Sequence, residues 1–344
     1  MSDDHVVIER RQFPRREEAE LALRALYRDR WPVLLAESAH ERSFALKCTL
    51  AARPSRDANL AEHLAGLFGI GIEDAAYYRR QARLGTTWCG LTLDHCWALE
   101  TFACWIRTRD DDLPPVIIHV DAHDDLQAPS LFVSADPMVF TIPLGQQMVD
   151  LRHPETVVPA IGRGFVGIGG FLVPLLHALG KGMYLHVSAD NRAHRGWLLL
   201  EDELVVSWAG AGRQPLARWG DEATECSRGI EAMATSDLSC IASLPENAPV
   251  LLDIDLDAFC DVYDDSRPAP DTIPTLEELR DRLTGVFTAL LYALRGRPIA
   301  TLTIAFSPGF FPSTLWRESL TLIEEFARDL LDADREEVRA WLYG

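Results

Sequence analysis

The sequence contains no CxxC pair of cysteines. Its seven cysteines are scattered singly along 344 residues. An odd number in a long chain disfavours a disulfide framework and fits a reduced protein with buried thiols. We therefore expect the chain to be cytoplasmic.

Long apolar runs and an excess of positive charge are also missing. No uninterrupted apolar stretch approaches the length of a membrane span, and the polar residues 1–5 lack the apolar core of a signal peptide. The formal net charge is −19 at pH 7, which argues against a general affinity for nucleic acid or for an anionic membrane. We expect a soluble protein whose partners include neither.

What the sequence does contain is enough apolar residues for a large core. They make up 48% of the chain, which suffices for one large α/β domain or for one with a modest extra subdomain. Residues 198–208 resemble a hairpin-like pair, and residues 210–243 are polar with a weak helix. Buried strands are predicted at 90–95, 116–120, 183–188, 250–257 and 299–305. Helical segments alternate with these strands, so we expect a mainly parallel sheet with helices on both faces.

The single domain, residues 1–344, is expected to begin with an extension. Residues 1–85 are predicted to be mixed and partly helical, and residues 86–344 to form the α/β core. Helices in the extension are expected at 16–27, 59–68 and 73–83. This extension contains no motif that indicates a chemistry.

Three residues that can bind a metal follow one of the predicted strands. The apolar, β-branched run at 116–120 leads into Asp121, His123 and Asp125, spaced two residues apart. Because side chains alternate between the faces of a strand, these three are expected on one face. Such a set beside a buried strand is costly unless a cation lies among them. His119 is expected on the opposite face from Asp121, in the core or behind the site.

A second strand repeats this design. The run at 250–257 carries Asp253, Asp255 and Asp257, again at every second position. A third strand leads to Asp94 and His95, and a junction between a strand and a helix is where α/β folds place ligands. The acids and the histidine together predict a metal site.

Several acids with one or two imidazoles are typical of two-metal hydrolases. Two divalent cations, held mainly by carboxylates, activate water for attack on an electron-poor carbon. Ligation dominated by oxygen, without thiolates, favours Mn²⁺ over a zinc site built on cysteine and histidine. The alternative is that these acids cap helices or bind one structural cation.

At these motifs the sequence resembles the arginase/ureohydrolase superfamily. The matching features are Asp94-His95, the DAHDD string at 121–125 and a later strand that ends in Asp-x-Asp. The strings LLDIDLDAF and TIAFSPGF look closer to a divergent branch that includes the peptide arginases. Those enzymes convert arginine residues of a ribosomally made precursor peptide to ornithine and release urea. The resemblance implies a three-layer arginase-like α/β fold with two Mn²⁺ ions per chain.

The resemblance also implies a ligand set. The ligands before the second acidic strand would be His95, Asp121, His123 and Asp125, with Asp121 bridging the two ions. The second strand allows two registers. If Asp253 replaces the serine of the SxDxD motif of the superfamily, the ligands are Asp255 and Asp257; otherwise they are Asp253 and Asp255. We prefer the first register, because it keeps an acid or hydroxyl before the pair.

Departures from ordinary arginases bear on the substrate. The glutamate that binds guanidinium would fall near Ala305, which cannot replace it, so another acid is needed; the candidates are Asp124, Asp136 and Asp190. The usual proton-shuttle histidine is absent. His186 is a candidate for that role, with core packing as the more frequent alternative for a buried histidine. Phe310 and Phe311 are expected to line the mouth of the pocket.

The resemblance, with these departures, implies a peptide arginase whose partner is an arginine-containing precursor peptide. Asp124 and His186 are the candidate catalytic residues beside the metal ligands. Two alternatives on the same fold are a ureohydrolase for a small guanidino compound and a metal-dependent deacetylase. A third is a non-catalytic, metal-stabilised binding protein.

Overall fold

The computed structural model describes residues 5–9, 15–26, 31–37, 43–49, 57–110, 112–143, 147–189, 193–207, 209–220, 228–262 and 273–344. A nine-stranded sheet organises the fold, in the order β12-β11-β13-β10-β6-β14-β15-β5-β4. In this order the strands are β12 (Gly210–Gly220), β11 (His194–Ser207), β13 (Arg228–Thr235), β10 (Met183–Val187), β6 (Val116–Val120), β14 (Val250–Asp255), β15 (Ile299–Ala305), β5 (Thr87–Thr92) and β4 (Arg79–Leu84). The strands from β13 to β5 are parallel, whereas β4, β11 and β12 pair antiparallel at the two ends. The expected mainly parallel sheet is therefore confirmed.

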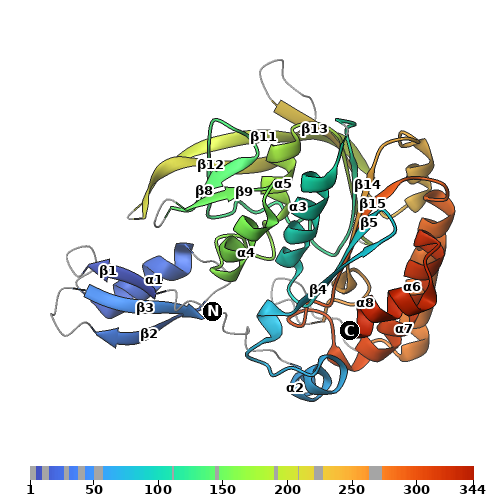
Figure 1. The fold of residues 1–344 in the computed structure, drawn as a ribbon, viewed down its shortest axis with the longest axis horizontal. Coiled ribbons are helices and arrows are strands. Elements are labelled where there is room, and N and C mark those ends of the chain that lie inside the picture. Colours follow the sequence, from blue (N-terminus) through green and yellow to red (C-terminus); the bar gives the residue numbers. More distant parts are fainter. Residues whose placement is uncertain are drawn as a thin grey trace.

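Helices cover both faces of this sheet (Figure 1). One face carries α3 (Ala98–Thr108), α4 (Pro154–Gly162) and α5 (Leu172–Leu179); the other carries α6 (Leu276–Ala293), α7 (Trp316–Leu331) and α8 (Arg335–Tyr343). Gly90 of β5 lets α3 approach closely, because a Cβ atom there would lie 2.3 Å from Thr101 Oγ1. The chain thus forms an α/β fold in layers.

Each face of the sheet has its own hydrophobic core, as the two-residue period of a strand requires. In β6, Val116, Ile118 and Val120 pack into the core under α6, α7 and α8, which we name the α6–α8 core. Ile117 packs into the core under α3, α4 and α5, the α3–α5 core. The polar residues of the site lie on this second face.

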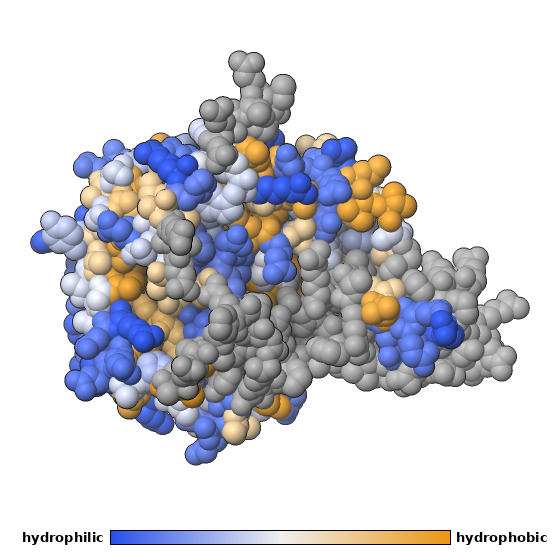
Figure 2. Space-filling model, turned by 180° about the vertical axis from the view of Figure 1, so that it is seen from behind, coloured by the Kyte–Doolittle hydropathy of each residue, from blue (hydrophilic) through white to orange (hydrophobic). Residues whose placement is uncertain are grey.

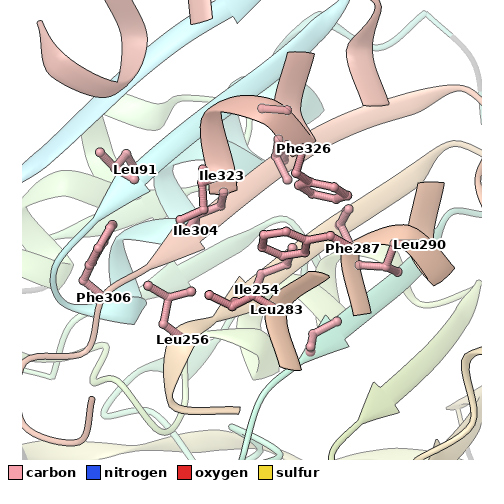
Figure 3. Packing of buried hydrophobic residues seen from close by; sticks show 14 of the residues in the cluster. Leu91, Ile254, Leu256, Leu283, Phe287, Leu290, Ile304, Phe306, Ile323 and Phe326 are labelled. Atoms are coloured by element: carbon pink, nitrogen blue, oxygen red, sulfur yellow. The ribbon is translucent and has the colours of Figure 1, made fainter. Parts of the chain in front are cut away.

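The α6–α8 core is a tight apolar layer (Figure 3). Phe287 of α6 stacks on Phe326 of α7 with ring centroids 4.3 Å apart. Ile254 and Ile304 face these rings from neighbouring strands. Fully burying one such side chain stabilises a protein by about 1.5–3 kcal/mol, so this layer anchors the strand β14 that carries the second acidic motif.

The first part of the chain forms a separate small sheet of β1 (His5–Glu9), β3 (Ser43–Thr49) and β2 (Trp31–Glu37), with α1 (Arg16–Leu26) beside it. The helix expected at 59–68 is present as α2 (Leu60–His63) followed by a π-helical turn, Leu64–Phe68. The prediction of a helix at 73–83 is wrong. Only a short 3-10 turn forms at Ala75–Tyr77, and β4 follows, because pairing with β5 outweighs the helix propensity of its residues. The large sheet therefore begins within the segment 1–85.

Residues 198–208 and 210–243 also differ from expectation. Residues 198–207 lie within a single long strand, β11, which pairs with β12 along most of its length, and residue 208 lies outside the described residues. The described parts of the second segment, residues 210–220 and 228–243, form two strands, β12 and β13, and a 3-10 helix at Leu238–Ser243, in place of a weak α-helix. A smaller sheet of β7 (Phe132–Val133), β8 (Val139–Thr141) and β9 (Met148–Asp150) completes the strands.

No helix among the described residues combines the length and the apolar character needed to cross a bilayer. The face seen in Figure 2 is a mosaic of hydrophilic and hydrophobic side chains.

Candidate metal centre

The site lies where the carboxyl ends of three parallel strands meet. His95 opens a 3-10 turn, His95–Trp97, just after β5; Asp121 follows β6; and Asp255 is the last residue of β14. A further 3-10 turn, Leu256–Ala258, carries Asp257. In open α/β sheets ligands bind at this edge, as the sequence predicts for these residues.

Three carboxylate oxygens surround the Nδ1 atom of His95. They are Asp121 Oδ2 at 3.0 Å, Asp125 Oδ2 at 3.2 Å and Asp255 Oδ2 at 3.0 Å. His95 is only 2% exposed and Asp121 only 1%. Within the described part of the chain, neither His95 Nδ1 nor Asp121 Oδ2 has a partner in hydrogen-bonding geometry. Buried polar atoms in this state are costly, and a cation held between them would satisfy both.

A second group of ligand atoms shares Asp121. His123 Nδ1 lies 3.1 Å from Asp257 Oδ2 and 3.4 Å from Asp121 Oδ1. The ligand atoms of these three residues all come within 4.8 Å of one another. Asp121 therefore turns one oxygen toward His95 and the other toward His123, an arrangement that suits a bridging carboxylate.

Asp253 lies on the Nε2 side of the His95 ring, away from Nδ1. Both of its oxygens lie 3.0 Å from His95 Nε2, and Oδ2 also lies 2.8 Å from His119 Nδ1. The hydroxyl of Thr303 on β15 donates to Oδ1. The oxygens of Asp255 and Asp257, by contrast, face the Nδ1 atoms of His95 and His123.

His119 does not lie on the opposite face from Asp121, so that prediction is wrong. Residues 119 and 121 are two positions apart and share a face by the same alternation that groups Asp121 with His123. His119 Nε2 lies 3.4 Å from Asp121 Oδ2, and the side chain is fully buried. Together with His95 and Asp121 it forms a cluster able to hold a metal ion.

Side chains from the sheet hold the loop after β6 in place. His186 on β10 lies with Nε2 3.0 Å from the carbonyl oxygen of Asp121, and the Tyr184 hydroxyl donates to the carbonyl of Asp124 at 2.9 Å. His119 Nε2 lies 3.2 Å from the carbonyl of His123. These contacts give His186 a role in fixing the loop.

Backbone strain is concentrated at the site. Asp125 has φ 50° and Ser307 has φ 41°, in the left-handed region that L residues rarely adopt. Ser307 also donates a hydrogen bond from its hydroxyl to Asp255 Oδ2. Such strain costs about 1–3 kcal/mol per residue and clusters at functional sites.

The metal-free histidines of the cluster are held in their charged form. Burial alone would lower the pKa of His95, but nearby carboxylates, first among them Asp253, raise it well above its usual value. Burial opposes protonation of His123 as well, yet its hydrogen bonds with Asp121 and Asp257 raise its pKa to about 12. Protons on the imidazoles thus balance part of the carboxylate charge.

The pKa values of the buried carboxyl groups shift in different directions. Burial and then the charge of Asp121 raise the pKa of Asp125 to about 7. Burial and the same charge raise the pKa of Asp257 well above its usual value. Burial would also raise the pKa of Asp253, but the charge of His95 outweighs it and lowers that pKa to about 2. More negative charge is gathered here than the imidazoles offset.

The donor set fits a divalent cation that prefers oxygen. In one group an imidazole lies among three carboxylates, and in the other an imidazole lies beside two carboxylates. Mn²⁺ and similar ions favour this kind of ligation.

The other candidate residues differ in position. Asp124 is partly buried, and its Oδ1 accepts a hydrogen bond from the backbone of Leu126. Asp136 pairs with Arg152 at 2.7 Å, which occupies one oxygen. Asp190 lies outside the described residues. Ala305, the position near which arginases would carry the guanidinium-binding glutamate, is fully buried in β15.

Two aromatic residues predicted to line the mouth have different environments. The ring of Phe310 lies 5.3 Å from that of His123, whereas Phe311 is fully buried in the α6–α8 core. Phe171, which the sequence did not indicate, is fully buried and packs its ring 4.6 Å from that of His95.

Comparison with models of known protein families finds no match for this chain, and a search of curated proteins also finds none.

Proposed function

We propose that the protein is a dinuclear metal-dependent hydrolase of the arginase-like fold that acts on arginine residues in a peptide. The observation that carries the metal centre is the Nδ1 atom of His95 amid the carboxylates of Asp121, Asp125 and Asp255, with Asp121 also reaching His123. The choice of arginine as substrate rests on the sequence resemblance.

The proposed ligands fall into two overlapping sets. His95, Asp125 and Asp255 would hold one ion, and His123 and Asp257 the other, with Asp121 shared. The position of Asp253 behind His95 supports the register in which Asp255 and Asp257 are ligands. When bound, two such ions lower the pKa of water and supply a nucleophile at neutral pH.

The substrate would approach from the end of the cluster marked by His123. Its side chain is 29% exposed, whereas that of His95 is 2% exposed. The partly exposed ring of Phe310 lies beside His123 there. An aromatic ring next to the carboxylates of the cluster would attract a planar cation such as guanidinium.

Asp124 and His186, the two candidate catalytic residues, are assigned different roles. Burial and then the charge of His119 lower the pKa of His186 to about 4, so at neutral pH the ring has no extra proton to give. Its bond to the Asp121 carbonyl supports a part in holding the loop rather than a proton shuttle. Asp124, partly exposed beside the ligands, stays a candidate for contact with guanidinium.

The test measures metal content and urea release together. We expect about two Mn²⁺ per chain after loading, and urea from a short arginine-containing peptide. Asp121→Ala should lose both properties, because the residue contributes to both ligand sets. Glu246→Ala, which removes an exposed acid, is the matched control and should retain both.

The outcomes separate the alternatives. Two metals without urea, but with hydrolysis of acetyl-lysine or free agmatine, would move the proposal to a deacetylase or a small-molecule ureohydrolase. One tightly held ion with no hydrolysis would favour a metal-stabilised binding protein. Unchanged metal content in Asp121→Ala would rule out this metal centre.

A further inference from the structure

We propose that Asp253 is a positioning residue that binds the Nε2 side of His95 and thereby aims its Nδ1 atom at one of the two metal positions. This inference rests on the proposed metal centre, but it concerns a residue outside the preferred ligand set. In the preferred register, Asp253 takes the place of the serine of the SxDxD motif.

The carboxylate of Asp253 is fully engaged by three donors. It is 0% exposed, and its oxygens contact His95 Nε2 at 3.0 Å and His119 Nδ1 at 2.8 Å. Thr303 donates the third hydrogen bond. Three donors from three different elements fix both the position and the plane of this carboxylate.

A fixed carboxylate determines which nitrogen of His95 carries a proton when a metal is bound. Hydrogen bonding of Nε2–H to Asp253 leaves the Nδ1 lone pair free to bind a cation. Nδ1 is the atom that faces the oxygens of Asp121 and Asp255. Without Asp253 the ring could rotate or change tautomer, and the first metal position would lose its only nitrogen ligand in the proposed set.

The geometry limits this effect to one metal position. The side chain of Asp253 contacts His95, His119 and Thr303, whereas His123 Nδ1 faces Asp121 and Asp257. Asp253 therefore belongs to the His95 side of the centre, and its loss should affect the two ions unequally.

The test is Mn²⁺ titration of wild type and Asp253→Asn, followed by calorimetry and by electron paramagnetic resonance. Asparagine keeps the size of the side chain, but it offers one acceptor in place of two and turns an amide N–H₂ toward one of the donors. Loss of an orienting partner typically weakens metal binding 10–100-fold. We expect one of the two sites to weaken by about this factor and the other to keep its affinity.

Nitrogen NMR of the His95 ring after loading with diamagnetic Zn²⁺ provides a second measurement. Wild type should show Nε2 protonated and Nδ1 bound to metal, and Asp253→Asn should lose this pattern. Asp237→Asn, a change of the same chemistry at the exposed cap of the 3-10 helix Leu238–Ser243, is the control. It should behave as wild type in both measurements.

The outcomes are distinct. Wild type that binds no metal would refute the proposed metal centre itself. Two wild-type affinities and an unchanged His95 pattern in Asp253→Asn would refute the positioning role while leaving the centre intact. If Asp253→Asn does not fold, Thr303→Val decides: we expect a smaller, several-fold weakening of the same site, and unchanged affinity there would overturn the inference.

Discussion

Replacing Asp125 with asparagine is expected to stabilise the metal-free protein. Burial and the charge of Asp121 raise the pKa of Asp125 from an ordinary 3.8 to about 7. The folded protein therefore holds this proton more tightly than the unfolded chain, so ionisation costs stability progressively from about pH 4 to about pH 7 and fully above that. A tenfold change in proton affinity corresponds to about 1.4 kcal/mol. The cost at pH 8 is then about 4 kcal/mol, which the neutral amide would remove.

Asp253 is the matched control with the opposite sign. Burial would raise its pKa, but the charge of His95 and the hydrogen bond from His119 lower it from 3.8 to about 2. Its ionised form is favoured by the fold, and this stability is present above about pH 4 and lost as the pH falls through about 2. By the same conversion, Asp253→Asn should cost the metal-free protein about 2 kcal/mol at pH 8.

Urea unfolding at pH 8 in the presence of a chelator measures both effects. We expect Asp125→Asn to unfold at higher urea than wild type, and Asp253→Asn at lower urea. An Asp125→Asn variant less stable than wild type would refute the conclusion that the cluster carries uncompensated negative charge. With Mn²⁺ present, wild type should gain more stability than Asp125→Asn, because only wild type has the complete ligand set.

Three further predictions follow from the same site and its supports. Mn²⁺ binding at pH 7 should release protons, because His95 and His123 are protonated without metal; equal calorimetric heats in buffers of different ionisation enthalpy would contradict this. Phe171→Ala should lower stability by about 3–5 kcal/mol, since the ring is fully buried against His95, and thermal unfolding within error of wild type would argue against it. Thr275→Ala removes the capping box that Thr275 forms with Glu278 at the start of α6; chemical unfolding should show a loss of about 1 kcal/mol with metal content unchanged, and a fall in metal content would contradict a purely local effect.

The sheet and the meeting of the acidic motifs could be predicted from the sequence. The strands β6, β14 and β15 are short, mainly apolar runs, and such runs fit strands buried on both faces. Parallel strands bring their carboxyl ends to one edge, so acids that follow β6 and end β14 must lie close together. This prediction used only composition and alternation.

The register of the second motif could not be read in the same way. Asp253, Asp255 and Asp257 have equal spacing, so alternation treats them alike. They differ because β14 ends at Asp255 and a 3-10 turn follows, which carries Asp257 to His123 while Asp253 stays within the sheet behind His95. Only the point at which the strand ends separates their roles.

Pairing with neighbouring strands explains why the secondary structure predicted elsewhere was wrong. Residues 79–84 have good helix propensity, but β5 offers an open edge and they join it as β4. The segment around β11 is charged and only partly buried, with its apolar residues alternating weakly. A strand of this kind is specified mainly by the neighbours that pair with it, β12 and β13.

The side chain of His123 is partly exposed to solvent, whereas His95 is buried beside the ring of Phe171. If the proposed centre holds two ions, a small chelator would reach the ion beside His123 first, and the inner ion would leave only afterwards. The two positions would then exchange at different rates, so brief dialysis could replace the outer ion alone. Such a protein could be prepared with two different metals in a known order, which would let spectroscopy address each position separately.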